Sequence, residues 1–431
     1  MFVLFFVVVV LLAHAYLWFR LVRRTTGPGR LRKALTWSVV ALFAVLVATL
    51  VGSRMGLEGW VVWPGFVWLA VMFYLVVILV VLEVPRGVAA AVLRRRSESV
   101  AAPAVAVPPV VVPAGAGAAV EDEVGPADVV VPAPGDVPAS ADVPASGDSS
   151  AAPAMSRRLF LDRTTAAIAG VGALGTVGYG MASALGDPVI EPVKVTLPKL
   201  DQRLAGLRFA VVSDIHLGPL TGIGHTERIV RMINGLEADV VAIVGDLVDG
   251  SVAQLGALAR PLQHLESRYG AYFVTGNHEY FTAEGPGEWI EELAELGVRS
   301  LRNERVEIRH QGAVLDLAGV NDVGGVAAGE SPDFAKALGG RDQGRSTVLL
   351  AHQPIQVKEA ARHGVDLQLS GHTHGGQIAP FNLVVGLQQP VVSGLATVDG
   401  VQVYVTRGAG FWGPPVRVGA PPEITILELR G

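Results

Sequence analysis

The sequence predicts an α/β layered domain that follows an N-terminal region of membrane helices. Three observations predict this organisation. Long apolar runs fill most of residues 1–82, an Ala/Pro/Val-rich stretch occupies residues 97–155, and short apolar segments alternate with polar clusters after residue 187. At ~150 residues per domain, a chain of 431 residues is expected to hold two or three structural units.

Composition excludes several classes of protein. Hydrophobic residues make up 51% of the chain and charged residues 17%, against about 25% charged residues in ordinary soluble domains. A wholly soluble protein, a disordered tail protein and a coiled coil are therefore disfavoured. The 34 Lys and Arg against 39 Asp and Glu give a net charge of −5, which argues against nucleic-acid binding. The absence of cysteine excludes disulfides, thiolate metal sites and cysteine nucleophiles.

Residues 1–96 are predicted to form a membrane region with three transmembrane helices. The apolar runs are Phe2–Phe19, Ala34–Gly52 and Trp60–Leu82. As helices they span roughly 27 to 35 Å, which matches the hydrocarbon core of a bilayer. Three such runs at one end of the chain disfavour the alternative, buried core helices of a soluble protein. A bilayer is thus an expected partner.

The basic residues predict the orientation of these helices. They lie between the first and second runs and after the third, whereas the charged residues between the second and third runs are Arg54 and Glu58 alone. The basic residues are Arg20, Arg23, Arg24, Arg30, Arg32 and Lys33, then Arg86, Arg94, Arg95 and Arg96. The positive-inside rule therefore places the N-terminus outside and residues 83–96 in the cytoplasm.

Residues 97–155 are predicted to be a disordered linker. They contain no Lys, Arg, Leu, Ile or aromatic residue, and the pentamer Asp136–Ser140 recurs at Asp142–Ser146. Such a segment cannot bury enough apolar surface to fold alone.

Residues 156–186 have two competing interpretations. Arg157 and Arg158 precede the mildly apolar stretch Thr164–Leu185, an order that resembles a twin-arginine export signal. The alternative is a fourth transmembrane helix with a basic cytoplasmic flank. Both interpretations place the rest of the chain outside the cytoplasm, so we expect a multi-pass protein of the cell membrane with an extracytoplasmic C-terminal domain. The glycine content disfavours a third interpretation, a helix of a soluble domain.

Residues 187–431 have ordinary domain composition, and five apolar segments predict short buried strands. These are Arg208–Val212, Val240–Val244, Ala271–Val274, Thr347–Leu350 and Leu367–Leu369. The segment His225–Leu236 predicts an amphipathic helix, because Ile229, Ile233 and Leu236 share one face. Alternating strands and helices favour a layered α/β domain, in which ligands bind at the carboxyl ends of strands.

A polar cluster follows each of these five strands. The clusters are Ser213–His216, Gly245–Asp249, Gly276–Glu279, Ala351–Gln353 and Gly371–His374. Residues two apart in a strand or its exit loop point the same way, so Asp214 and His216 are expected to converge on one ion, and His372 and His374 are expected to face a shared cleft. Glycines before Asp246, Asn277 and His372 are expected to permit tight turns.

Together the clusters offer an oxygen- and imidazole-rich ligand set. Seven side chains form it, with His278 as a spare histidine: Asp214, His216, Asp246, Asn277, His352, His372 and His374. Mixed imidazole and oxygen ligands favour Mn, Fe, Zn or Ni over Ca. Seven ligands exceed the need of one tetrahedral ion, so two ions are expected. A pair of metals about 3.5–4 Å apart is typical of phosphoryl displacement.

The order and spacing of these clusters resemble the calcineurin-like metallophosphoesterase superfamily over residues 207–378. The motif Gly371–Gln377, the membrane region and the stretch Trp412–Ile424 resemble its bacterial membrane-associated or exported members. The resemblance implies two packed mixed β-sheets flanked by helices. It also implies that Asp214, His216 and His374 bind one metal, that Asn277, His352 and His372 bind the other, and that Asp246 bridges both.

The same resemblance implies a role for three further residues. His278 would face the phosphate, and Asp249 and Glu279 would orient ligands by hydrogen bonding. Two cations would lower the pKa of a bridging water, so that hydroxide attacks phosphorus in line with the leaving alcohol.

The sequence therefore predicts a membrane-anchored, metal-dependent phosphohydrolase that uses two ions, Mn, Fe or Zn, and cleaves a phosphoester substrate. The alternatives are a lipid-linked pyrophosphate hydrolase at the membrane surface and a non-enzymatic membrane sensor or scaffold. Among the remaining residues, Asn321 and Asp322 predict a turn rather than a site, and Phe411 and Trp412 are expected to pack near the rim of the cleft.

Overall fold

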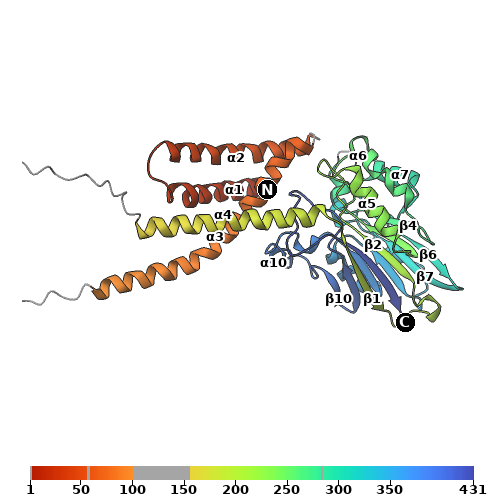
Figure 1. Cartoon of the computed structure of the whole chain (residues 1–431). Coiled ribbons are helices and arrows are strands. Elements are labelled where there is room, and N and C mark those ends of the chain that lie inside the picture. The colour runs from red at the N-terminus through yellow and green to blue at the C-terminus, as the bar shows by residue number, and fades with distance from the viewer. Residues whose placement is uncertain (1, 56–58, 101–155, 283–284) are drawn as a thin grey trace, which may run out of the picture. The chain divides into compact units, whose positions relative to one another are not determined.

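The computed structural model describes residues 2–55, 59–100, 156–282 and 285–431 (Figure 1). The chain divides into two units, one formed by residues 1–81 with residues 162–431 and the other by residues 82–161. Most of the predicted linker, residues 101–155, lies outside the described residues. The linker is predicted to begin at Ser97, whereas the preceding helix continues to Val100.

The apolar runs form helices. They are α1 (Phe2–Leu17), continued by a π-helical turn η1 (Trp18–Arg23), then α2 (Arg30–Arg54), α3 (Gly59–Val100) and α4 (Arg157–Leu185). Among the described residues, three helical segments are long and apolar enough to cross a membrane: Arg30–Ser53, Gly59–Val88 and Arg157–Leu185. The first predicted run is a helix as well, but α1 alone is 16 residues long.

Six strands form the first β-sheet, in the order β1-β12-β2-β3-β4-β5. They are β1 (Val189–Thr196), β2 (Arg208–Val212), β3 (Val240–Val244), β4 (Ala271–Val274), β5 (Val298–Ser300) and β12 (Glu423–Arg430). The sheet is mixed, because β2 to β5 run parallel while β12 pairs with β2 in the antiparallel direction.

A second mixed sheet of six strands has the order β10-β11-β9-β8-β7-β6. Its strands are β6 (Glu304–His310), β7 (Ala313–Gly319), β8 (Thr347–Leu350), β9 (Leu367–Ser370), β10 (Gly394–Val398) and β11 (Val401–Val405). Strands β7, β8, β9 and β11 are parallel, and the outer strands β6 and β10 pair with their neighbours in the antiparallel direction.

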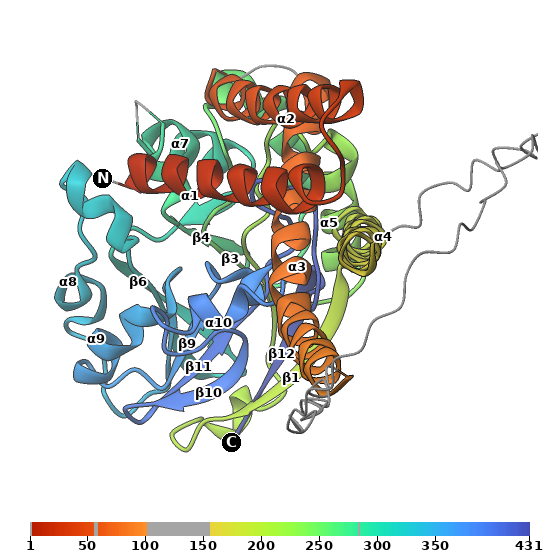
Figure 2. The same ribbon diagram turned by 90° about the vertical axis from the view of Figure 1, so that its left-hand side faces the viewer.

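The two sheets pack face to face, and helices cover their outer faces. In β2, Phe209 and Val211 enter the core between the sheets, while Ala210 and Val212 point to the opposite face. That face is covered by α5 (Ile223–Asn234), α6 (Val252–Ala259) and α7 (Gly287–Glu295). Figure 2 shows α8 (Phe334–Leu338) and α9 (Val357–Arg362) beside the second sheet. Strands buried on both faces explain the continuous apolar runs.

The predicted fold class is confirmed: two packed mixed sheets are flanked by helices and preceded by apolar helices. Four of the five predicted strands, β2, β3, β4 and β8, coincide with the structure, and β9 extends one residue further, to Ser370. Short 3₁₀ turns complete the domain: η2 (Gln202–Leu204), η3 (Arg260–His264), η4 (His278–Tyr280), η5 (Val323–Ala328), η6 (Pro354–Gln356) and η7 (His374–Gly376), with a short helix α10 (Asn382–Val385).

Candidate metal centre

The five predicted polar clusters meet at one edge of the sandwich. Strands β2, β3 and β4 are parallel neighbours in the first sheet, and β8 and β9 are parallel neighbours in the second. Four of the clusters begin at the residue after their strand, and the cluster Gly276–Glu279 begins one residue later, after Thr275. The carboxyl ends of parallel strands lie together, so residues far apart in the sequence become neighbours.

Carboxylate and imidazole atoms converge in three overlapping groups. Within each group the ligand atoms lie within 4.8 Å of one another: Asp214, His216 and His374; His216, Asp246 and His278; and Asp246, His352 and His372. The Nε2 atom of His374 lies 3.2 Å from Asp214 Oδ1, and that of His352 lies 3.2 Å from Asp246 Oδ2. Asp246 belongs to two of these groups, so it links His216 to His352 and His372.

The seventh predicted ligand, Asn277, follows Gly276 in the loop after β4. Its buried Oδ1 atom has no hydrogen-bond partner among the described residues. The same is true of His352 Nε2 and His372 Nδ1. Buried polar atoms without partners are rare in native proteins. A cation would satisfy these atoms, so the residues present fit a metal site.

Hydrogen bonds at the far side of two rings orient their inner nitrogens. His352 Nδ1 donates to the carbonyl oxygen of Val244 at 2.8 Å, and His216 Nδ1 donates to Asp249 Oδ1 at 2.8 Å. With Nδ1 as the donor, Nε2 is the ring atom left to bind a cation, and it lies 3.2 Å from Asp246 Oδ2 in His352 and 4.0 Å from it in His216.

His278 shares the same carboxylate. Its Nδ1 donates to Asp249 Oδ1 at 2.7 Å, and its backbone N–H donates to Asp246 Oδ1 at 2.9 Å. Burial lowers the pKa of His278, but the charges of Asp246 and Asp249 outweigh burial and raise this pKa to about 9. Asp249 therefore holds His216 and His278 in fixed orientations at the same time.

Glu279 holds the two loops that follow β3 and β4. Its carboxylate accepts backbone N–H groups from Gly276 at 2.6 Å, Asp246 at 3.1 Å, Leu247 at 2.7 Å and Val248 at 3.3 Å. Burial and the nearby charge of Asp246 raise its pKa to about 7. The side chain therefore orients the backbone beneath the cluster rather than a ligand side chain directly.

Five of the predicted ligands have a left-handed backbone. The φ angles are 51° for Asp214, 49° for His216, 50° for Asp246, 70° for His372 and 53° for His374. Non-glycine residues adopt this conformation at a cost in free energy, and they concentrate at functional sites. Asp214 and His216 do converge, but strand alternation is the wrong reason, because β2 ends at Val212 and both residues turn inward in left-handed loops.

Two of the predicted glycines are needed because another strand's carboxylate lies against them. A Cβ atom on Gly276 would overlap Asp246 Oδ1 and would lie 2.5 Å from Asp246 N, and one on Gly371 would overlap Asp214 Oδ2. Because glycine has no side chain, the carboxylates of Asp246 and Asp214 can lie directly against the backbone of Gly276 and Gly371.

Arg417 supports the backbone of the candidate metal centre, a role that the sequence did not predict. The side chain is fully buried and donates to the carbonyl oxygens of His374 at 2.8 Å, Arg407 at 2.9 Å and Gly410 at 2.9 Å. Burial lowers the pKa of its guanidinium to about 9. The one available signal was an arginine inside the otherwise uncharged stretch Trp412–Pro422.

Aromatic residues lie beside His278. Its ring centroid is 4.7 Å from that of Phe281 and 5.9 Å from that of Trp412. Phe411 is buried, whereas Trp412 is 56% exposed. The two aromatic residues predicted at the rim thus divide between the interior and the surface.

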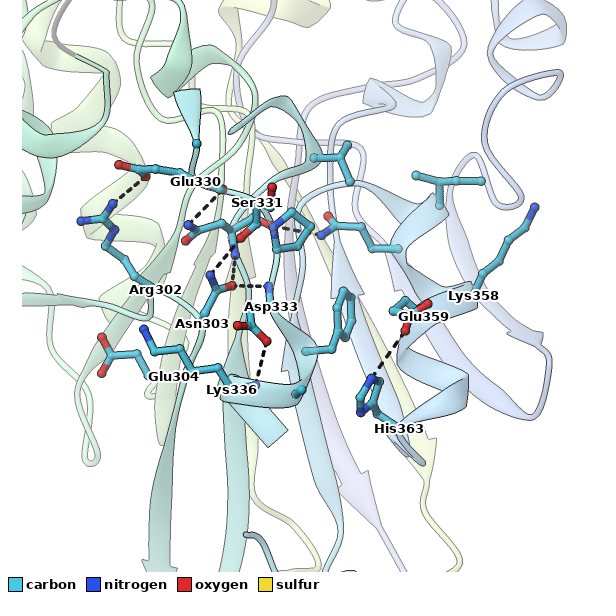
Figure 3. Close-up of a pocket in the computed structure, with 18 residues that line it drawn as sticks. Arg302, Asn303, Glu304, Glu330, Ser331, Asp333, Lys336, Lys358, Glu359 and His363 are labelled. Atoms are coloured by element: carbon cyan, nitrogen blue, oxygen red, sulfur yellow. Dashed lines mark hydrogen bonds and ion pairs between the residues drawn. The ribbon is translucent and has the colours of Figure 1, made fainter. Parts of the chain in front are cut away.

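Asn321 and Asp322 lie outside the three groups. Asp322 accepts from Gly324 N at 2.6 Å and caps the start of η5, which fits the predicted turn. Asn321 lines a cavity of about 1130 Å³. Asn303, Glu330 and His363, which are labelled in Figure 3, line the same cavity. None of the seven predicted ligands lines this cavity, so it is separate from the candidate metal centre.

Comparison with known proteins agrees with this geometry. The calcineurin-like phosphoesterase family matches residues 207–376, which contain all five clusters. An uncharacterized metallophosphoesterase of Helicobacter pylori is 40% identical over 262 residues, or 59% of this chain and 68% of that protein. The chain belongs to the calcineurin-like phosphoesterase family. Family membership supports a phosphoester-hydrolysing enzyme with bound metal ions.

Other relatives in the family extend the comparison. An uncharacterized metallophosphoesterase of Aquifex aeolicus is 34% identical, over 51% of this chain and 83% of its own length. A transmembrane protein with metallophosphoesterase domain from Danio rerio is 40% identical over 58% of this chain. This chain spans about 60% of the length of that relative. Together with the apolar helices, the Danio rerio relative supports association with a membrane.

Substitution of Gly276 by alanine tests the close approach at the centre. We expect Gly276→Ala to displace Asp246, to lower the free energy of unfolding by about 1–3 kcal/mol and to reduce the bound metal. The control is Gly224→Ala in α5, where a Cβ would meet nothing within 4 Å. Metal content and the thermal unfolding midpoint of the full-length protein in detergent provide the measurement, and an unchanged metal content would contradict the expectation.

Proposed function

We propose that this protein is a membrane-anchored phosphohydrolase that uses two metal ions. The observation that carries the proposal is that Asp246 is grouped with His352 and His372 and also with His216, which is itself grouped with Asp214 and His374. One carboxylate shared by two ligand groups is the arrangement that a bridging ligand requires. Intact ligand groups also argue against a non-enzymatic sensor or scaffold.

We assign Asp214, His216 and His374 to one ion and Asn277, His352 and His372 to the other, with Asp246 between them. Imidazole and oxygen donors favour Mn, Fe or Zn. When bound, such a pair would lower the pKa of a shared water and neutralise charge on the phosphoryl oxygens.

The proposed role of His278 is to face the substrate. Its Nδ1 donates to Asp249, which leaves Nε2 as the free end of the ring, 3.9 Å from Asp246 Oδ2. From this position Nε2 would donate a proton to the leaving oxygen or stabilise charge on the phosphate.

For residues 156–186 we favour a fourth membrane helix over an export signal. Asp162 of α4 forms ion pairs with Arg20 at 3.7 Å and Arg24 at 3.9 Å, and Arg163 Nε donates to the carbonyl oxygen of Thr25 at 3.1 Å. These contacts join α4 to the basic end of the N-terminal helices, the end predicted to be cytoplasmic. At the opposite end, Gly180 O of α4 accepts from Arg417 N at 2.9 Å. The proposed topology is therefore multi-pass, with an extracytoplasmic catalytic domain.

Two substitutions separate chemistry from metal binding. Asp246→Asn should remove bound metal and all turnover, because it withdraws the charge shared by both ligand groups. His278→Ala should lower kcat by roughly 10²–10⁴-fold while the metal remains. The full-length protein in detergent is assayed on phosphomonoester and phosphodiester reporters with added Mn, Fe or Zn, alongside metal analysis. Loss of metal in the His278 variant would refute its assigned role, and no metal-dependent turnover on any reporter would support the sensor alternative.

The hydrogen bonds from His216 and His278 to Asp249 predict that this carboxylate strengthens metal binding. Asp249→Asn should weaken metal binding by about 10–100-fold, because a neutral amide orients His216 and His278 less strongly than a carboxylate does. Metal titration of the full-length protein measures the change, and Asp342→Asn in an exposed loop is the matched control. If both variants bind metal equally, Asp249 has no positioning role.

Reporter fusions test the topology. A reporter that is active only outside the cytoplasm should be active after Gly186 and inactive after Arg96. Equal activity at the two positions would mean that residues 157–185 do not cross the bilayer.

A further inference from the structure

An exposed apolar segment borders the candidate metal centre. Residues 380–388, here called the apolar loop, include α10 and expose large apolar side chains. Leu387 is 85% exposed, Leu383 is 71% exposed, and Val384 and Phe381 are also exposed. The surrounding sequence contains no Asp, Glu, Lys or Arg from Gly375 to Val398. Clustered exposed apolar side chains are typical of surfaces that bind another apolar phase.

The apolar loop is held against the ligand-bearing turn. The backbone of Asn382 lies so close to Gly376 that a Cβ atom there would overlap it. Gly376 is the last residue of η7, which begins at the predicted ligand His374. The loop is therefore a fixed part of the rim of the metal centre.

The residues just before the apolar loop pack against the membrane helices. Ile378 forms a β-bridge with Val418, and both side chains pack against the apolar cluster that contains Leu75 of α3 and Val177 of α4. Ala379 N donates to Val418 O at 2.9 Å. The polypeptide thus passes directly from the surface packed on the membrane helices into the exposed apolar loop.

Further contacts place the same edge of the domain at the membrane helices. A Cβ atom on Gly413 would lie 3.8 Å from the ring of Phe66 in α3, and one on Gly59, the first residue of α3, would overlap the carbonyl oxygen of Pro219. The side chains of Trp412 and Phe281 are exposed beside His278. Tryptophan is enriched where a protein crosses the membrane–water interface.

From these contacts we propose that the apolar loop inserts into the surface of the bilayer that holds the N-terminal helices, and that the metal centre acts on phosphoesters carried by membrane amphiphiles. The substrate part of this inference rests on the proposed phosphohydrolase function. An uncharged apolar rim suits acyl chains, whereas the buried carboxylates and imidazoles beneath it suit a metal-bound phosphate group. A lipid-linked pyrophosphate is one member of this substrate class.

The insertion is tested without any enzyme assay. Because the chain lacks cysteine, a single cysteine at Leu383 or Leu387 accepts one fluorescent label. Leu395 in β10, which is 44% exposed, provides the control position. In nanodiscs of phosphatidylcholine and phosphatidylglycerol, labels on L383C and L387C should be quenched by a nitroxide-bearing lipid and protected from aqueous iodide. The label on L395C should show the reverse. Iodide access at 383 and 387 equal to that at 395 would overturn the proposal.

Substrate class is tested with two esters that share the same reacting bond. Methyl 4-nitrophenyl phosphate is soluble, whereas hexadecyl 4-nitrophenyl phosphate enters the nanodisc. The double variant Leu383→Ser/Leu387→Ser should lose about tenfold in kcat/KM on the hexadecyl ester, because less apolar surface is buried, and should keep its activity on the methyl ester. Leu395→Ser should leave both activities unchanged.

The outcomes distinguish the two proposals. An equal loss on both esters would overturn the substrate inference, because the loop would then act through the structure of the site. No turnover of either diester, together with none of the phosphomonoester reporter, would count against the phosphohydrolase function, while the quenching pattern would still decide whether the loop inserts.

Discussion

The carboxylate of Asp246 is the group on which the candidate centre depends. It is fully surrounded by protein, and a buried negative charge is costly unless positive or hydrogen-bonding groups compensate it. Burial alone would raise its pKa, yet the imidazoles of His352, His278 and His216 hold this pKa well below its usual range. Each loop that supplies a neighbour must therefore reach Asp246 closely, and this requirement explains Gly276 and the left-handed backbone of the ligand residues.

The surrounding residues stabilise this arrangement by fixing loops rather than by adding ligands. Glu279 accepts N–H groups from two loops of the first sheet, and Asp249 orients two imidazoles through one oxygen atom. Arg417 has a related role on the other side of the cluster, because its guanidinium binds the carbonyl oxygen of His374. Carboxylate and guanidinium side chains can hold several backbone groups at once, since each offers more than one acceptor or donor.

Arg417 also connects the centre to the apolar helices. Its backbone N–H donates to Gly180 in α4, and its side chain binds the residue that opens η7. The segment that packs on the apolar helices is thus the same segment that supports the turn with His374. In the proposed topology, the segment that holds the domain at the bilayer is therefore also the one that supports the metal centre, and the apolar loop begins beside it.

The sequence by itself determined the local features of this protein. Strands such as Val240–Val244 and Ala271–Val274 were predictable to the residue, because strands buried on both faces are short apolar runs that end in polar clusters. The candidate ligands, the family and the apolar helices were predictable for the same reason: each is encoded in neighbouring residues. The left-handed turns at Asp214 and Asp246, the four acceptor contacts of Glu279, the burial of Arg417 and the position of the apolar loop were decided only by the tertiary structure. These features arise from contacts between segments distant in the chain, and no local pattern of residue types specifies which loops will meet.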